Sequence, residues 1–378
     1  MKILLTGGGT GGHFYPIIAV AESLRRISKE EKLIDAELYY MAPARYDDKA
    51  LFENRIIHVS SYAGKIRRYF SLLNVFDVFK TAVGVIKAVV DVWRIYPDVV
   101  FGKGGYVSFP AMFAAKLLRI PVVIHESDSH PGRVNAWASK FAQKIAVSYE
   151  QAADFFPKDK VAFTGNPIRR EVRETLSEGA RQFLGLDESL PVVLILGGSQ
   201  GSQRINEAVI DVLPELVGKC YIIHQTGKDN IDEMTNTAEV VLKESIHKNR
   251  YRPFAYLNSM SLRMAAGEAA KSGLVISRAG STIFEIALWQ VPSIIIPIPE
   301  EISHDQKSNA FAYAASGACS VIEEINLTPH VLLSEIDRII DNPNIADKMR
   351  HGAATFGKKD ASDTIAREII RIALSHSQ

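Results

Sequence analysis

The stretch that decides the fold is residues 2–13, KILLTGGGTGGH, in which an apolar run leads into a glycine-rich turn. A helical pattern follows over residues 16–27. This order opens a doubly wound α/β domain. It returns in the second half, where VVLIL at residues 192–196 precedes GGSQGS at 197–202 and another helical pattern. The sequence therefore predicts two α/β domains that each begin with a strand, a glycine turn and a helix.

Short apolar runs alternate with helical patterns through both halves, as they do around a buried parallel sheet. The predicted strands are residues 2–6, 37–41, 99–102, 122–125 and 144–147, and then 192–196, 221–225, 274–277, 293–297 and 318–322. A short strand ends in turn residues at 163–167, so we predict domains at 1–164 and 165–378. A last helix is expected over 361–375. Its packing partner stays open, with the first domain as one alternative.

Composition narrows the class of protein. The 378 residues carry 44 Lys and Arg against 43 Asp and Glu, and this near-neutral balance argues against nucleic acid as the main partner. The two cysteines, Cys220 and Cys319, form no CxxC pair, which argues against a zinc site and favours a reducing compartment. The longest uncharged run, residues 3–21, holds five glycines and is a poor membrane span. We expect a cytoplasmic protein whose membrane contact is peripheral.

The first glycine loop satisfies GxGxxG through Gly7, Gly9 and Gly12. A dinucleotide site also needs an acidic residue at the end of the second strand, and that strand ends in Ala42-Pro43. The pattern therefore opposes an NAD-dependent oxidoreductase, although the loop still suits a phosphate or carbonyl oxygen at a helix N-terminus. A tight turn that binds nothing is the alternative.

His13 is expected in the first turn of the following helix, where the helix dipole favours the neutral imidazole. A neutral imidazole at neutral pH is what a general base requires. A histidine that only packs against the turn is an equal alternative.

Polar loops also follow the strands of the second half. The segment 277–285, SRAGSTIFE, opens a helix whose free amides suit a diphosphate, and Glu285 can accept hydrogen bonds from a ribose diol. Gln306 follows the next strand and can bind sugar hydroxyls. Structural turns, a charge that complements the helix dipole and a solvated helix cap are the alternatives.

In the first half, GKGGYVS at 102–108 and HESDSHPG at 125–132 follow successive strands and predict a wide binding rim. The spacing of His125, Glu126 and His130 matches no standard metal motif, so we expect no metal. The stretch 65–76 is basic and then aromatic. Membrane contact by Lys65, Arg67, Arg68, Phe70, Leu72 and Leu73 is one reading, and ordinary helix packing with solvated lysines is the other.

Taken in order, the segments GGGTGGHFYP, GKGGYVS, HESD…PG, GNPIR, GGSQGS and SRAG…E with DQxxNA resemble the MurG family of glycosyltransferases over essentially the whole chain. The resemblance implies two Rossmann-like domains facing a cleft (the GT-B fold), with an acceptor and membrane domain first and a UDP-sugar domain second. It implies inverting transfer of N-acetylglucosamine from UDP-GlcNAc to the muramoyl 4-hydroxyl of undecaprenyl-diphospho-MurNAc-pentapeptide. This converts lipid I to lipid II, without a cofactor, at the cytoplasmic membrane face, where cell-wall synthesis proteins are further candidate partners.

The resemblance also assigns residues by motif. His13 becomes the base, and the substrate-binding positions are Thr10, Gly11, Gly12, Asp128, Arg169, Ser199, Leu257, Ser281, Thr282, Glu285 and Gln306. Among these, Leu257 lies beside the uracil and Glu285 binds the ribose. The sequence departs from the family pattern at two places. Asp128 replaces the Asn of the common HEQN form. One residue fewer separates Gly280 from Glu285 than in the common family form, which shifts the register of Ser281 and Thr282.

Two other classes of protein remain open from the sequence. A related glycosyltransferase that glycosylates diacylglycerol shares these features, and it is separated from the first reading by its acceptor. A non-catalytic UDP-sugar binder would bind the donor but show no turnover.

Overall fold

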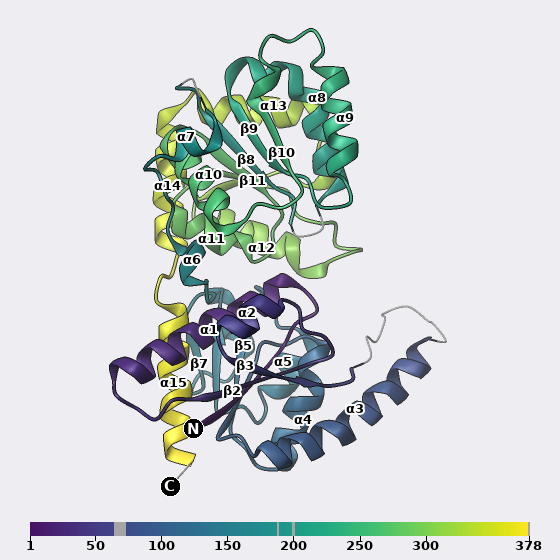
Figure 1. Cartoon of the computed structure of the whole chain (residues 1–378), viewed down its shortest axis with the longest axis vertical. Coiled ribbons are helices and arrows are strands. Elements are labelled where there is room, and N and C mark those ends of the chain that lie inside the picture. Colours follow the sequence, from purple (N-terminus) through teal and green to yellow (C-terminus); the bar gives the residue numbers. More distant parts are fainter. Residues whose placement is uncertain (64–72, 187–188, 199–200, 377–378) are drawn as a thin grey trace. The chain divides into compact units, whose positions relative to one another are not determined.

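The chain forms two α/β units, which the computed structural model describes over residues 1–63, 73–186, 189–198 and 201–376 (Figure 1). Unit 1 comprises residues 1–170 and 358–378, and unit 2 comprises residues 171–357. The prediction of two doubly wound domains is confirmed. The predicted ranges need correction, because the boundary follows residue 170 rather than 164 and the final helix belongs to unit 1.

Unit 1 is built on a parallel sheet whose strand order reverses beside its first strand. The order is β3-β2-β1-β4-β5-β6-β7. The strands are β1 Lys2–Thr6, β2 Glu37–Ala42, β3 Ile56–Ser60, β4 Val99–Gly102, β5 Val122–Glu126, β6 Lys144–Val147 and β7 Val161–Phe163. The helices are α1 Gly11–Glu30, α2 Asp48–Glu53, α3 Leu73–Ile95, α4 Phe109–Leu117, α5 Arg133–Ala138 and α15 Ala361–His376, with 3₁₀ turns η1 Tyr106–Ser108 and η2 Glu150–Phe155. The loops after β1 and β4 therefore lie at the switch point, where such sheets bind ligands.

Unit 2 repeats this plan around β8, with the order β10-β9-β8-β11-β12-β13. The strands are β8 Val192–Leu196, β9 Tyr221–Gln225, β10 Tyr251–Phe254, β11 Leu274–Ser277, β12 Ser293–Ile295 and β13 Cys319–Val321. The helices are α7 Ala180–Leu184, α8 Gln203–Lys219, α9 Ile231–Val241, α10 Ser259–Ser272, α11 Thr282–Trp289, α12 His304–Ala314, α13 Pro329–Ile340 and α14 Pro343–Phe356. Helix α6 Arg170–Arg173 joins the units, and η3 Lys248–Arg250 and η4 Glu324–Asn326 are 3₁₀ turns.

Strands β3 and β10 are not indicated by the sequence pattern, and both are edge strands. An edge strand is covered less completely than a central one, so its residues do not form a continuous apolar run. In β3 only Ile56 is buried and the other residues are partly or fully exposed, and β10 carries Arg252 and Pro253. Proline is tolerated there because an edge strand need not donate every amide to the sheet.

The final helix, α15, packs along α1 in unit 1 (Figure 1). Its residues Ile365 and Ile369 are buried in the same apolar cluster as β1 and α1. Polar contacts fix the start of the helix, because Asp363 accepts a 2.7 Å hydrogen bond from Ser23 Oγ and lies 2.6 Å from Nη2 of Arg26. The apolar face of α15 thus completes the cover of the first sheet, which explains its place in unit 1.

We expect Ile369→Ala to lower the free energy of unfolding by about 2–5 kcal/mol, because the isoleucine is fully buried and its truncation leaves a cavity. Urea denaturation followed by tryptophan fluorescence and circular dichroism measures this loss. Leu374→Ala is the matched control on the same helix, since Leu374 is 45% exposed and should cost far less. Equal losses for the two variants would contradict the packing of α15 described here.

Candidate active site

The turn after β1 is held in a backbone conformation that only glycine adopts easily. Gly7, Gly8 and Gly9 have φ values of 145°, 136° and 92°. Space is short as well, because a Cβ on Gly7 would lie 2.7 Å from Lys103 Cβ and one on Gly8 would lie 2.5 Å from the Tyr40 hydroxyl. That hydroxyl donates a 2.7 Å hydrogen bond to Gly7 O. The loop is thus fixed closely against two neighbouring strand ends.

Helix α1 begins at Gly11, five residues before the predicted start, with Thr10 as its N-cap residue. The amides of His13 and Phe14 donate to Thr10 O. The amides of Gly11 and Gly12 lie in the first turn, where the helix itself supplies no acceptor. Thr10, Gly11 and Gly12 therefore form an N-terminus suited to a phosphate oxygen.

His13 occupies the third position of this helix, as the sequence predicts. Its Nδ1 lies 3.0 Å from Thr10 Oγ1, and its Nε2 faces Gly105, where a Cβ would be 3.9 Å away. When Nδ1 carries the ring proton and donates it to Thr10, Nε2 is free to accept a proton. Burial first, and Lys103 second, lower the pKa of His13, while Asp128 opposes them. The neutral imidazole that a base requires is therefore favoured.

The loop at 127–132 is organised by the carboxylate of Glu126. This carboxylate accepts hydrogen bonds from the amides of Ser127 (2.8 Å), Asp128 (3.1 Å) and Gly132 (2.9 Å) and from Asn135 Nδ2 (2.9 Å). Burial, followed by the charge of Asp128, raises the pKa of Glu126. Because its oxygens are engaged in this way, Glu126 shapes the binding rim rather than facing a substrate as a base.

In unit 2 the glycine loop after β8 leads to Ser202, which caps α8 by accepting a hydrogen bond from Ile205 N (3.4 Å). A Cβ on Gly201 would lie 2.0 Å from Thr226 O, so only glycine fits there. The predicted contact residue Ser199 lies outside the described residues. The hydroxyl that the structure places at the start of α8 is that of Ser202.

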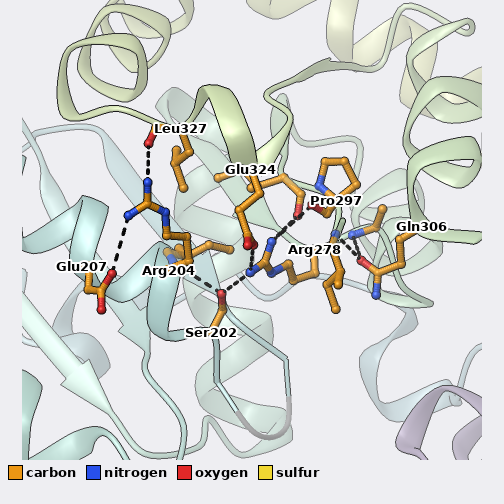
Figure 2. Close-up of polar contacts among 12 residues, drawn as sticks. Ser202, Arg204, Glu207, Arg278, Pro297, Gln306, Glu324 and Leu327 are labelled. Carbon is orange, nitrogen blue, oxygen red and sulfur yellow. Dashed lines mark hydrogen bonds and ion pairs between the residues drawn. The ribbon is translucent and has the colours of Figure 1, made fainter. Parts of the chain in front are cut away.

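Arg278 ties together three loops of unit 2 (Figure 2). Its Nη2 donates to Ser202 Oγ (2.6 Å) and pairs with Glu324 (2.5 Å), and its Nη1 donates to Ile296 O (3.1 Å) and Pro297 O (3.4 Å). The guanidinium is thus fixed by the ends of β8 and β12 and by η4. The sequence alone indicates no role for this arginine, because its partners are distant along the chain.

Helix α11 begins at Thr282, within the segment predicted to open a helix, and Ser281 is its N-cap residue. Both residues are partly exposed, and Glu285 lies in the first turn. Gln306 braces this region, because its Oε1 accepts hydrogen bonds from Ala279 N and Ile298 N, both 3.2 Å long. The amide oxygen of Gln306 is therefore used by the protein, and a sugar hydroxyl would meet the Nε2 donor.

A cavity of about 570 Å³ opens beside this network. Its lining includes four carboxylates, from Glu300, Glu301, Glu323 and Glu324, and two cationic side chains, from Arg204 and Lys307. Such an acidic lining repels a diphosphate. Within unit 2, the start of α11 therefore suits a diphosphate better than this cavity does.

Two other predicted contact residues have surroundings that the sequence did not show. Leu257 is only 2% exposed, and its amide donates to Gln225 Oε1 (3.0 Å), so its side chain and its amide are both engaged within unit 2. Arg169 belongs to unit 1, where its guanidinium carbon lies 3.9 Å from the centre of the Tyr15 ring. Among the described residues, no group of three or more His, Cys, Asp or Glu is arranged to hold a metal.

Comparison with known proteins matches both halves of the chain. The glycosyltransferase family 28 N-terminal domain matches residues 3–147, and the C-terminal domain of that family matches residues 192–365. A UDP-N-acetylglucosamine–N-acetylmuramyl-(pentapeptide) pyrophosphoryl-undecaprenol N-acetylglucosamine transferase of Bacillus anthracis is 37% identical over 371 residues, which cover 97% of this chain and 99% of the relative. The protein of the same name from Treponema denticola is 34% identical and covers 95% of each chain.

Solved structures agree on the fold. MurG of Acinetobacter baumannii superposes with a TM-score of 0.73 at 24% identity, covering 98% of this chain and 99% of that one. A UDP-GlcNAc 2-epimerase of Neisseria meningitidis bound to UDP-GlcNAc superposes with a TM-score of 0.67 at 15% identity, covering 98% and 100%. Proteins with this fold catalyse at least two different reactions, so the fold alone does not identify the reaction. Sequence identity to the named transferases over nearly the full length does identify the family, and this chain belongs to the MurG family of glycosyltransferase family 28.

Proposed function

We propose that this chain transfers N-acetylglucosamine from UDP-GlcNAc to the muramoyl 4-hydroxyl of lipid I, with inversion at the anomeric carbon, and so forms lipid II for peptidoglycan synthesis. Membership in the MurG family supports the reaction class and both substrates. The observation that carries the mechanism is the position of His13 in the first turn of α1, at a glycine-lined helix N-terminus of unit 1, where burial lowers the pKa of its imidazole.

The transfer is a single displacement. His13 Nε2 takes the proton from the 4-hydroxyl as its oxygen attacks the anomeric carbon of the donor, and the bond between that carbon and the β-phosphate oxygen breaks. In unit 1, the amides of Gly11 and Gly12 and the hydroxyl of Thr10 bind the diphosphate of the acceptor, and Asp128 binds a sugar hydroxyl beside them. These roles follow from the free donors at the start of α1 and from the loop that Glu126 fixes.

Unit 2 binds the donor in this proposal. The start of α11, with Ser281 and Thr282, stabilises the charge that develops on UDP as it leaves. Glu285 accepts hydrogen bonds from the ribose hydroxyls, Gln306 donates from Nε2 to the sugar, and the segment at Leu257 lies along the uracil. The loop that contains Ser199 completes the set of donor contacts in unit 2 by motif. Arg278 and Glu324 hold the loops in place.

Transfer of labelled N-acetylglucosamine to a lipid I analogue tests the proposal against its rivals. We expect a labelled disaccharide lipid with the lipid I analogue and none with diacylglycerol, and UDP-GlcNAc, but not NAD, should raise the melting temperature. Product only with diacylglycerol would support the related glycolipid transferase. A higher melting temperature with UDP-GlcNAc but no product with either acceptor would indicate a non-catalytic protein that binds sugar nucleotides.

We also propose that unit 1 meets an anionic membrane surface at the cytoplasmic face, where a polyprenyl-linked acceptor is found. None of the helices in the described ranges has the length and apolar character needed to cross a bilayer. Helix α3 instead carries an exposed apolar stripe of Val83, Ile86, Val90 and Trp93, which are between 41% and 68% exposed and share one helix face by their spacing of three and four residues. The basic stretch 65–68, where the sequence predicted contact, precedes this helix and lies outside the described residues.

We expect sedimentation with phosphatidylglycerol vesicles to weaken about fivefold for Arg67→Ala, because one basic residue near an anionic surface contributes about 1 kcal/mol. The Lys65, Arg67 and Arg68 triple variant to alanine should lose most of the salt dependence. Ile86→Ser should also weaken binding. Ile246→Ser is its control, since Ile246 is also an exposed isoleucine but lies in unit 2. Salt-insensitive binding, or equal effects of the two isoleucine variants, would contradict the assignment.

A further inference from the structure

The loop that follows β2 reaches the glycine turn of unit 1. Strands β1 and β2 run parallel, with Thr6 opposite Met41, so the chain leaves both strands at the same edge of the sheet. A dinucleotide site has an acidic residue at the end of the second strand. Here the strand ends in Ala42-Pro43, and the loop that follows brings Tyr46 to the start of α1. The loop therefore supplies a phenol where a dinucleotide-binding fold supplies a carboxylate.

The hydroxyl of Tyr46 lies beside Gly11, the first residue of α1. A Cβ on Gly11 would be 3.1 Å from the Tyr46 hydroxyl oxygen and 3.4 Å from the Tyr15 ring. The phenol thus occupies space next to Gly11 that a side chain there would need. Because Gly11 and Gly12 open the helix, the hydroxyl is a third donor beside their two amides.

The ring of Tyr46 is held by aromatic neighbours. Its centroid lies 5.1 Å from that of Phe14, which is fully buried, and 5.9 Å from that of Tyr15, whose ring is nearly perpendicular to it. The next residue, Asp47, accepts hydrogen bonds from Ala50 N (3.0 Å) and from the Tyr15 hydroxyl (3.4 Å). These contacts fix the loop and give the Tyr46 hydroxyl a defined place.

The fold itself does not use this hydroxyl. Within the ranges that the structure describes, Tyr46 Oη makes no hydrogen bond to the protein, and the residue is 38% exposed. Tyr40, which reaches the same turn from β2, shows the contrast, because it is buried and its hydroxyl donates to Gly7 O (2.7 Å). The hydroxyl of Tyr46 therefore remains available to a ligand at the glycine turn.

We propose that Tyr46 is a further binding residue for the acceptor: its hydroxyl donates a hydrogen bond to an oxygen of the acceptor diphosphate at the start of α1. This inference rests on the proposed function, which places that diphosphate at Thr10, Gly11 and Gly12. A hydrogen bond to an ionised phosphate oxygen is stronger than one between neutral groups. The bond also has a fixed direction, because the aromatic contacts hold the ring.

Kinetics of Tyr46→Phe test this contact, since the substitution removes only the hydroxyl and keeps the ring. We expect KM for a lipid I analogue to rise about tenfold, the effect of losing one hydrogen bond to a charged group. The kcat, the affinity for UDP and the melting temperature should stay nearly unchanged. Tyr96→Phe is the control, because Tyr96 is 54% exposed and precedes β4, at the amino ends of the strands of the same sheet. An unchanged KM in Tyr46→Phe, or equal effects of the two variants, would overturn the proposal.

Calorimetry with farnesyl diphosphate, a prenyl diphosphate without a sugar, separates this contact from the transfer reaction because binding needs no turnover. Saturating UDP is present, so that the proposed donor site in unit 2 is occupied. We expect the unaltered protein to bind farnesyl diphosphate and Tyr46→Phe to bind it about tenfold more weakly.

The outcomes distinguish the two proposals. If Tyr46→Phe weakens farnesyl diphosphate binding but no disaccharide lipid forms, the diphosphate contact stands and the proposed transfer fails. If transfer proceeds and Tyr46→Phe binds farnesyl diphosphate normally, the transfer stands and the diphosphate contact is overturned, even where KM for the lipid I analogue rises. Failure of the unaltered protein to bind farnesyl diphosphate would also overturn the contact.

Discussion

We expect His13→Ala to lower kcat by about 10²- to 10⁴-fold while UDP affinity stays nearly unchanged. A positioned general base contributes this much to a proton transfer. The affinity for UDP should stay nearly unchanged because His13 lies in the first turn of α1 in unit 1, whereas the proposed uridine contacts lie in unit 2. Steady-state kinetics with a lipid I analogue and calorimetry with UDP measure the two quantities. His351→Ala is the matched control, since His351 is an exposed histidine of α14.

The pH dependence sharpens this test. Burial and Lys103 lower the pKa of His13 below its ordinary value of 6.5, so the neutral, active form persists until the pH falls through the lowered pKa. The rate should therefore decline on the acidic side below the usual range of histidine. This limb should disappear in His13→Ala, because no imidazole remains to be protonated.

Two other outcomes would assign His13 differently. If His13 only packs against the turn, His13→Ala should lower the thermal stability and leave the activity per folded molecule nearly intact. A fall in kcat with a surviving acidic limb would move the base to another residue. From the sequence alone Glu126 would be next, but its carboxylate is engaged by loop donors, so Asp128, the carboxylate that acts on His13, is the residue to test.

We expect Glu285→Ala to weaken UDP binding by roughly 30- to 150-fold, with the protein still folded. Loss of a carboxylate that holds two ribose hydroxyls costs about 2–3 kcal/mol, and 1.4 kcal/mol is a factor of about ten in affinity. Glu285 lies in the first turn of α11, where an acid also stabilises the helix by at most about 1 kcal/mol. A helix effect alone would thus lower stability slightly and leave UDP affinity almost intact.

Calorimetric titration with UDP and with UMP measures this loss. Both ligands carry the ribose, so both should weaken by a similar factor in Glu285→Ala. Glu239→Ala, at an exposed acid of α9, should bind both normally. Normal UDP affinity in folded Glu285→Ala would reject the ribose contact, and a loss confined to UDP would assign Glu285 to the diphosphate region instead.

The central elements of the fold could be predicted because their signals are local. Strands β1 and β8 are continuous apolar runs that end in glycine loops, and the structure has them at the predicted residues. Edge strands β3 and β10 lack that signal, because part of each strand faces solvent. The place of α15 depends on contacts with α1, which is more than 300 residues earlier in the chain, as in the Ser23–Asp363 hydrogen bond.

In the candidate site, too, local sequence patterns could be predicted and contacts between distant segments could not. Glycine loops, His13 in a first turn and Glu285 at a helix start are short-range patterns, and their positions on the elements could be predicted. The partners of Lys103, Glu126 and Arg278 could not, because each side chain is fixed by loops from other strands. The burial of the Leu257 side chain could not be predicted either, because its motif indicates a contact position and not the surroundings of the side chain.

NMR analysis of the disaccharide released from the lipid product tests the proposed single displacement most directly. UDP-GlcNAc is α-linked, so one attack by the muramoyl 4-hydroxyl must give a β-linked N-acetylglucosamine on that oxygen. We predict only this β-1,4 linkage, formed together with one UDP per disaccharide. An α-linkage, attachment at another hydroxyl, or release of UDP without any disaccharide would contradict the account.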